Sequence, residues 1–474
     1  MKDTVVRLES VSIENFKNVE NGQLSFANNR KNYRTSILGL YGQNGSGKTA
    51  LIDVIELLQL ALRGQPVPVK FADYINVESG HSVLRYEFSV SGENESYQVF
   101  YEFKLGSEKI EASQNMAVNE DEEIRYRAII TDEILSYSYE SAELKARKST
   151  LIDTSSPKVF TPVGKYNCLI GKDKETAMSL MVEKKVALGT SRSFVFSREL
   201  LTAMRNNRDG KDNPEYLRHM RLIESLVRYG NYELFVINTA NSGIISMNVL
   251  PLSFKYDDGS VGAVGNILIP LEEAVPIPKE ALDMVEHVIA NMNVVLAQIV
   301  PGLTIRVEAL GEMLFANGKK GIKVQLMSQK NKKAIPLKYE SEGIKKIISI
   351  LQLLIVVYNR SSITVAIDEL DAGVFEYLLG ELLRIISEKG KGQLLFTSHN
   401  LRPLETLDRG FIAFTTTNPS NRYLRMSNLK DNNNLRDFYF RDIILGEQSE
   451  EVYDPTNNAE IALAFREAGE FSGS

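Results

Sequence analysis

Hydrophobic residues recur along the first third of the chain with the two spacings that distinguish strands from helices. The apolar run over 35–41 predicts a buried strand, and the apolar spacing over 50–58 predicts a helix directly after it. Alternation over 5–26 predicts two strands joined by a turn at Asn21 and Gly22. Three further alternating segments, separated by Gly, Asn and Ser, predict antiparallel strands over 86–90, 97–103 and 134–139.

The rest of the chain changes its period twice. From Lys172 to about Leu296 the pattern is mostly helical, with apolar spacings near 3.6 over 215–228 and 279–300. Strand patterns then return over 303–307, 322–327, 362–370, 392–400, 410–415 and 422–426, the last two as edge strands.

This order of elements predicts an α/β protein, and 474 residues are enough for a large core and two lobes. We expect an N-terminal lobe with antiparallel strands over 1–170, a mostly helical insertion over 171–300 and a C-terminal lobe over 301–474.

Composition excludes several classes of protein. No apolar run reaches the length of about 20 residues that a transmembrane helix needs, and the N-terminus does not have the pattern of a signal peptide. We therefore expect a cytoplasmic protein. A net charge of −6 argues against a basic DNA-coating protein. Cys168 is the only cysteine, which excludes disulfides within the chain and multi-cysteine zinc sites.

The strongest motif lies between the strand over 35–41 and the helix over 50–58. Its glycines allow backbone N–H groups to curl around a phosphate, its lysine brings a positive charge to the β- and γ-phosphates, and its threonine hydroxyl is placed to bind Mg²⁺. A glycine-rich turn that matches by chance is disfavoured by the flanking strand and helix. The motif matches G-x-x-x-x-G-K-[ST] in full, with Gly42, Gln43, Asn44, Gly45, Ser46, Gly47, Lys48 and Thr49.

Two adjacent acids, Asp368 and Glu369, end the hydrophobic strand predicted over 362–370. This is the Walker B arrangement, in which Asp368 would hold Mg²⁺ through water and Glu369 would act as the general base toward the attacking water. The alternative is that the two acids cap the next helix. It does not account for their place after the predicted helix that begins near Ser341 and Gly343, whose start also carries a motif.

The order of these motifs resembles a known class of ATPases. A strand, the turn Asn15-Phe16-Lys17, a second strand and then a phosphate loop resemble the opening of SMC and RecF-type proteins. These are ABC-class ATPases in which two heads hold ATP between them. Taken alone, Phe16 is a core aromatic residue and Lys17 is a solvated turn residue.

Later segments resemble the remaining motifs of this class. Ser341 and Gly343 at a helix start resemble the signature motif, which implies binding of the γ-phosphate held by a second subunit; an N-cap is the alternative. Asp371 matches the D-loop, which crosses to the other subunit, and His399 matches the switch histidine that senses the γ-phosphate. No glutamine loop can be assigned.

The segment over 368–376, DELDAGVFE, resembles the ATPase subunit of a bacterial anti-phage system, with PARIS as the named match. The resemblance implies ATP and Mg²⁺ as cofactors, slow hydrolysis gated by dimerisation and a homo-oligomer, from ATP-sandwich dimers to a higher-order ring. It also implies a separately encoded TOPRIM-type nuclease and a phage trigger protein. A Septu-type ATPase with an HNH nuclease, a RecF-like DNA-repair ATPase and a nucleotide-binding scaffold without enzymatic activity are the alternatives.

Basic residues of the predicted insertion bear on the DNA-repair alternative. They are mixed with acids, which favours a solvated surface over a nucleic-acid interface. The residues are Lys184, Lys185, Arg205, Arg208, Lys211, Arg218 and Arg221.

Overall fold

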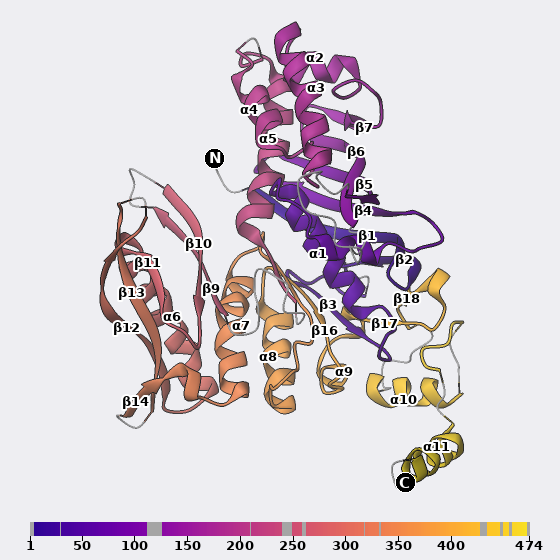
Figure 1. The fold of residues 1–474 in the computed structure, drawn as a ribbon, viewed down its shortest axis with the longest axis vertical. Coiled ribbons are helices and arrows are strands. Elements are labelled where there is room, and N and C mark those ends of the chain that lie inside the picture. The colour runs from indigo at the N-terminus through magenta and orange to yellow at the C-terminus, as the bar shows by residue number, and fades with distance from the viewer. Residues whose placement is uncertain are drawn as a thin grey trace, which may run out of the picture.

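The described residues form two six-stranded sheets and, to one side, a four-stranded and a two-stranded antiparallel sheet, so the predicted α/β class is confirmed (Figure 1). The computed structural model describes residues 4–28, 30–110, 126–208, 210–238, 249–257, 262–316, 318–330, 333–426, 434–445, 449–454 and 457–471.

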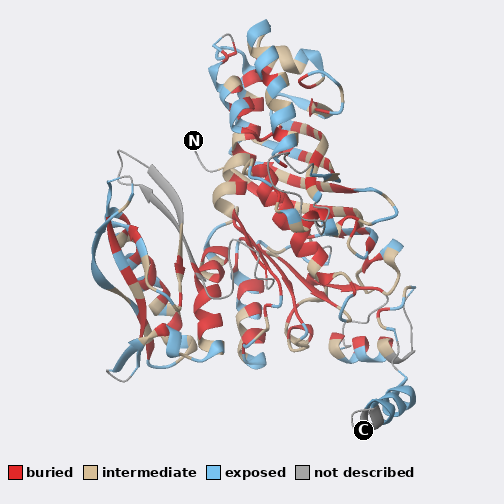
Figure 2. Cartoon of the chain, in the orientation of Figure 1, coloured by how far each residue is buried: buried red, intermediate tan, exposed pale blue. Residues whose placement is uncertain are grey.

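The central sheet contains the strand that precedes the phosphate loop. Its strands from β17 to β8 pair in parallel, and only β18 is antiparallel to its neighbour. These short strands are buried on both faces, as parallel strands covered on both sides usually are (Figure 2). In spatial order they are β18 (Tyr423–Leu424), β17 (Ile412–Thr415), β3 (Ser36–Tyr41), β16 (Gln393–Thr397), β15 (Thr364–Ile367) and β8 (Leu234–Ile237).

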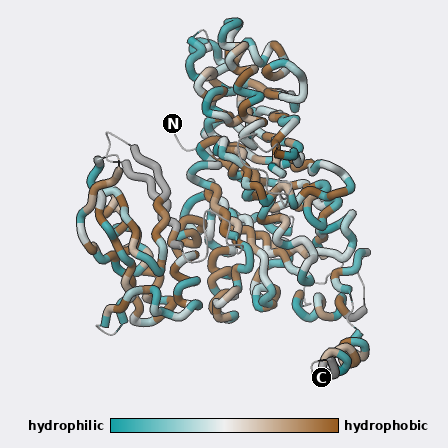
Figure 3. Tube along the Cα trace, in the orientation of Figure 1, coloured by the Kyte–Doolittle hydropathy of each residue, from teal (hydrophilic) through white to brown (hydrophobic). Residues whose placement is uncertain are grey.

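Helix α1 (Lys48–Leu62) lies between the central sheet and the antiparallel sheet. Every residue of α1 except Thr49 is buried, which fits its apolar sequence (Figure 3). It packs on β8, β15 and β16, and the Val54 carbonyl accepts a hydrogen bond of 2.8 Å from the Tyr86 hydroxyl of the antiparallel sheet. That sheet consists of β2 (Val19–Ser25), β1 (Val5–Phe16), β4 (His81–Ser91), β5 (Glu95–Lys109), β6 (Tyr126–Ser141) and β7 (Lys145–Asp153).

Helices α7 (Glu342–Asn359) and α8 (Glu376–Lys389) cover the other face of the central sheet. In β15, Val365 and Ile367 pack in the cluster that contains α7, whereas Ala366 packs in the cluster that contains α1. The strand period of two therefore assigns alternate side chains to the two layers. Helix α9 (Pro403–Thr406) connects β16 to β17, and α10 (Leu435–Leu445) and the exposed helix α11 (Asn458–Phe471) follow the last strand, β18.

A helical lobe packs against the far end of the antiparallel sheet (Figure 1). The buried carboxylate of Glu133 in β6 joins the two, because it accepts hydrogen bonds from the Tyr101 and Ser193 hydroxyls and from the backbone N–H groups of Phe194 (2.7 Å) and Val195 (3.3 Å). Burial raises the pKa of Glu133. The helices are α2 (Val163–Leu169), α3 (Lys174–Gly189), α4 (Arg198–Asn206) and α5 (Pro214–Arg228).

The expectation of a mostly helical insertion over 171–300 is wrong in its second half. After α5 the chain returns to the central sheet as β8, whose four apolar residues are too few to show a period. The expected boundary at 300 also falls inside one unit, because α6 (Leu282–Ile299) packs on β12 (Leu303–Leu314). The other strands of this side are β9 (Val249–Asp257), β10 (Gly262–Pro270), β11 (Val275–Pro278), β13 (Lys320–Lys330) and β14 (Lys333–Pro336).

The predicted turn at Asn21 and Gly22 is also wrong. Both residues lie inside β2, opposite Glu14 and Ile13, and the turn falls at Lys17 and Asn18. Lys17 has a left-handed backbone, φ 52°, a conformation that lysine rarely adopts, so its sequence did not suggest a turn there.

We predict that Glu133→Leu lowers the free energy of unfolding by about 3 kcal/mol, because two buried backbone N–H groups lose their acceptor. Glu133→Gln keeps an acceptor oxygen and should cost about 1 kcal/mol. Urea unfolding of the two variants measures the difference, and equal losses would show that the carboxylate does not fix the 193–195 segment.

Candidate nucleotide-binding site

The phosphate loop follows directly from β3 and ends in α1. Gly47 is the N-cap of α1 with a left-handed backbone, φ 95°, which glycine adopts without a steric cost. The Lys48 ammonium turns back over the loop and donates to the carbonyls of Gly42 (2.8 Å) and Gln43 (2.9 Å). Burial lowers the pKa of Lys48, while the nearby charges of Asp368 and Glu369 oppose that shift.

The carboxylate of Asp368, at the end of β15, faces the start of α1. Its Oδ2 accepts a hydrogen bond of 3.2 Å from the Thr49 hydroxyl, and its Oδ1 accepts one of 2.5 Å from the Thr397 hydroxyl. The structure therefore brings the two predicted metal-binding residues together. Their oxygens fit Mg²⁺, which usually takes one or two protein ligands and completes its shell with water and substrate phosphates. Among the described residues, no three His, Cys, Asp or Glu side chains gather around one metal position.

Glu369 has a strained backbone beside this carboxylate. Its φ is 48°, a left-handed conformation that is uncommon for residues other than glycine. Its N–H donates to the Thr397 hydroxyl (2.8 Å), while its side chain is exposed. Residues held in such conformations cluster at functional sites.

The predicted loop and acids line one cavity of about 350 Å³. His399 lies at the same cavity, and its backbone N–H donates to the Asp371 carboxylate (3.1 Å). Ser46 instead points to the back of the loop, and Gly42 and Gln43 line an adjacent cavity. The lining residues are Lys17, Asn18, Asn44, Gly45, Gly47, Lys48, Thr49, Ala50, Asp368, Glu369, Thr397 and His399.

Sequence reasoning missed three residues of this site. Lys17 lines the cavity, forms an ion pair with the buried Asp53 and lies 3.9 Å from the centre of the Tyr74 ring. The Asn18 amide donates to the Gly45 carbonyl. Both belong to the Asn-Phe-Lys-Asn segment that carried the family resemblance, so the sequence did contain a pattern that could have assigned them to the site. Thr397 gave none, because its contact with Asp368 depends on the pairing of β15 with β16.

Lys346 of α7 is a further missed residue. It is buried near the carboxylates of Asp371, Glu369 and Asp368, and burial lowers its pKa to about 8 although these charges oppose the shift. It thus connects the helix of the predicted signature motif with the acids electrostatically.

The predicted signature residues lie at the start of α7, beside the segment of the predicted D-loop. Ser341 is the exposed N-cap of α7, where its hydroxyl accepts from the Ile344 N–H (3.4 Å). A Cβ on Gly343 would meet the Gly373 carbonyl at 2.5 Å, so the signature and D-loop segments pack backbone to backbone. Neither Ser341 nor Gly343 lines the cavity of about 350 Å³.

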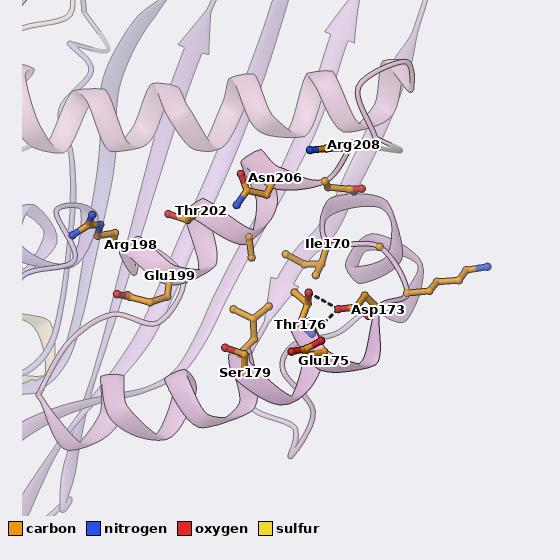
Figure 4. A pocket seen from close by; sticks show the side chains of 15 residues that line it. Ile170, Asp173, Glu175, Thr176, Ser179, Arg198, Glu199, Thr202, Asn206 and Arg208 are labelled. Carbon is orange, nitrogen blue, oxygen red and sulfur yellow. Dashed lines mark hydrogen bonds between the residues drawn. The ribbon is translucent and has the colours of Figure 1, made fainter.

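A larger cavity, of about 800 Å³, lies elsewhere, between α3 and α4 of the helical lobe (Figure 4). Its polar lining has both signs of charge, including Glu175, Glu199, Arg198 and Arg208. The candidate nucleotide site is therefore chosen for its chemistry and not for its size.

Three of the seven basic residues considered for nucleic acid form hydrogen bonds or ion pairs within the protein, and the Arg218 guanidinium lies 5.6 Å from the centre of the Tyr139 ring. Lys184 donates to three backbone carbonyls, and Arg205 and Arg221 form ion pairs with Glu224 (3.2 Å) and Glu95 (2.8 Å). These contacts agree with the interpretation of this face as a solvated surface and not a nucleic-acid interface.

The loop, α1 and most of the antiparallel sheet fall within a recognised domain. Residues 10–209 match the AAA domain. The matched segment is less than half of the chain and ends before β8, so it does not include Ser341, Asp368 or His399. No curated protein matches the chain.

Among solved structures the chain is similar to SMC heads. One is the SMC head domain from Thermotoga maritima, at 13% identity and a TM-score of 0.35, with 89% of this chain and 100% of that chain covered. Another is the Smc head domain with an extended coiled coil bound to the C-terminal domain of ScpA from Pyrococcus furiosus, at 11% identity and 0.37, with 89% and 96% covered. A third, the SmcHead bound to the C-winged helix domain of ScpA, has 10% identity and 0.36, with 89% and 98% covered. These likenesses are too distant to bear on the site.

None of the helices in the described ranges combines the length and apolar content needed to span a bilayer.

We predict that Lys48→Ala abolishes ATP binding while leaving the melting temperature near that of the wild type, because the ammonium faces the loop and not a core. Lys389→Ala, an exposed lysine of α8, is the matched control. Fluorescent-nucleotide titration and thermal melting measure both variants. Wild-type affinity in a folded Lys48→Ala protein contradicts the site.

Proposed function

We propose that the chain is an SMC-like ATPase that binds and slowly hydrolyses ATP and whose site is completed by a second copy. The observation that carries this proposal is the contact of Asp368 with Thr49 beside the strained Glu369, all at one cavity with Lys48. Strain at Glu369 also argues against a nucleotide-binding scaffold, since a purely structural acid needs no such backbone.

In this proposal the chain's own residues divide the work. The loop N–H groups and Lys48 hold the phosphates, and Thr49 and Asp368 would hold a Mg²⁺ ion that offsets the phosphate charge. The exposed carboxylate of Glu369 accepts a proton from the attacking water, and His399 lies at the same cavity to contact the γ-phosphate.

A shared site is supported by the surface around the signature residues. Ser341 is exposed and does not line the cavity at the phosphate loop of its own chain, and three large aromatic side chains close in the sequence to Ser341 or Asp371 are exposed as well. These are Tyr339 (67% exposed), Phe375 (70%) and Tyr377 (55%), which flank Ser341 and Asp371 in the sequence. Clustered exposed aromatic residues are typical of protein interfaces.

We further propose that this ATPase is the switch subunit of an anti-phage defence complex. It would sense a phage protein and control a separately encoded nuclease of TOPRIM type. The support is the sequence resemblance of the segment over 368–376, and a Septu-type pairing with an HNH nuclease rests on the same resemblance. The internal pairing of Lys184, Arg205 and Arg221 makes a RecF-like DNA-binding role the weaker candidate.

We predict that Glu369→Gln still binds ATP but hydrolyses it at least about two orders of magnitude more slowly, because the amide cannot accept the proton. ATP-engaged oligomers should accumulate and be visible by size-exclusion chromatography. Glu388→Gln, the same change at the far end of α8, should leave turnover unchanged. Wild-type turnover in Glu369→Gln would assign the base to another residue.

We predict that inactive Lys48→Ala and Ser341→Arg subunits recover ATPase activity when mixed. A mixed dimer then contains one site with both defects and one site with none. Mixing Lys48→Ala with the double variant Lys48→Ala/Ser341→Arg is the control, since no intact site can form. No recovery, in mixed oligomers verified by a tag pull-down, contradicts a site shared between copies.

A further inference from the structure

The strands after His399 had no role in the sequence analysis, yet they lie against the phosphate loop. Strand β17 pairs in parallel with β3, and the register places Phe414 opposite Tyr41. Thr415, the last residue of β17, therefore comes level with Gly42, where β3 ends and the loop begins. Strand β18 folds back antiparallel to β17, so the two form a short hairpin beside the loop (Figure 1).

The Thr415 hydroxyl contacts the back of the loop. It lies 2.5 Å from the Ser46 hydroxyl and 3.3 Å from the Tyr41 carbonyl. The Ser46 hydroxyl in turn donates to the Gln43 carbonyl at 2.6 Å. Each of these hydroxyls has one proton and a carbonyl that accepts from it, Gln43 for Ser46 and Tyr41 for Thr415, so either hydroxyl can donate in the short contact between them. The two hydroxyls form a chain that runs from Thr415 through Ser46 to Gln43.

This hydroxyl also determines the first residue of the motif. A Cβ on Gly42 would lie 1.7 Å from the Thr415 Oγ1, so no larger residue fits there while Thr415 holds its place. Thr415 is completely buried, and its position is fixed by the pairing of β17 with β3. A residue 373 positions further along the chain thus shapes the start of the loop.

The other strand of the hairpin contacts the end of the loop. The buried Tyr423 donates from its hydroxyl to the Gly47 carbonyl at 3.0 Å. Beside it, the Arg422 guanidinium donates to the carbonyls of Asn18 (2.6 Å) and Thr416 (2.7 Å). The hairpin therefore touches both ends of the loop and leaves the side that lines the cavity free.

We propose that Thr415 is a positioning residue of the phosphate loop, acting through Ser46 to hold the loop in the conformation that binds phosphate, with Tyr423 supporting its other end. The inference rests on the proposed ATP-binding function and assigns part of that function to the C-terminal hairpin. These contacts orient the backbone N–H groups of the loop before the nucleotide binds. Less conformational entropy is then lost on binding.

The decisive comparison is between Thr415→Val, which keeps the shape and removes the hydroxyl, and Thr415→Ser, which keeps the hydroxyl and removes a methyl group. Thr415→Val should weaken ATP and ADP binding about five- to tenfold, the equivalent of one net hydrogen bond. Because the loop holds phosphate throughout the reaction, KM should rise while kcat stays within about twofold. Thr415→Ser should bind nearly as the wild type does, even if it melts at a lower temperature.

Two further variants distinguish an effect on the position of the loop from an effect on the stability of the fold. Thr364→Val removes another fully buried hydroxyl of the same sheet, one that contacts Gln393 at 3.0 Å and not the loop, so it should change stability without changing affinity. In a Ser46→Ala background, adding Thr415→Val should cause little further loss of affinity, because the connecting hydroxyl is already gone.

Wild-type ATP affinity in Thr415→Val, equal weakening in Thr415→Ser, or full additivity with Ser46→Ala would each overturn this inference while leaving the proposed function intact. Failure of the wild-type protein to bind ATP, measured in the same titration, would instead refute the proposed function and this inference with it.

Discussion

The buried carboxylate of Asp368 is the contact on which the candidate site depends. At 1% exposure it has little access to water, so protein donors must replace its hydration, and the hydroxyls of Thr49 and Thr397 do so. These hydroxyls come from α1 and β16, while the carboxylate ends β15. Thr49 and Asp368 are 319 positions apart, so the site exists only when the central sheet has formed with α1 on its face.

Burial of α1 gives that contact its rigidity. The helix is enclosed by the central sheet on one side and by the antiparallel sheet on the other, and only Thr49 escapes full burial. A closely packed helix transmits its position to its first turn, where Lys48 and Thr49 stand. The left-handed backbones of Lys17 and Glu369, which both line the cavity, are kept in place by the same surroundings.

Long periodic segments were predicted well because their information is local. The helices over 215–228 and 279–300 appear as α5 and as α6 with the turn before it, and the antiparallel strands appear as β4, β5 and β6. Prediction failed where a segment was too short to show a period or where its structure depends on residues far away in the sequence. Strand β8 has four residues, too few to show a period. Gly22, which suggested a turn, lies instead beneath the Tyr423 ring, where a Cβ would be 2.5 Å from the ring atoms.

The phosphate-binding character of the loop could be predicted from the sequence alone, because Gly42, Lys48 and Thr49 lie within eight consecutive residues. The sequence also placed two acids at the end of a strand. Only the tertiary structure decided what surrounds these groups: that Lys17 and Thr397 join the cavity, and that Thr415 stands behind Ser46. The reason is physical. A motif records backbone geometry over a few residues, whereas strand pairing brings together side chains that no local pattern connects.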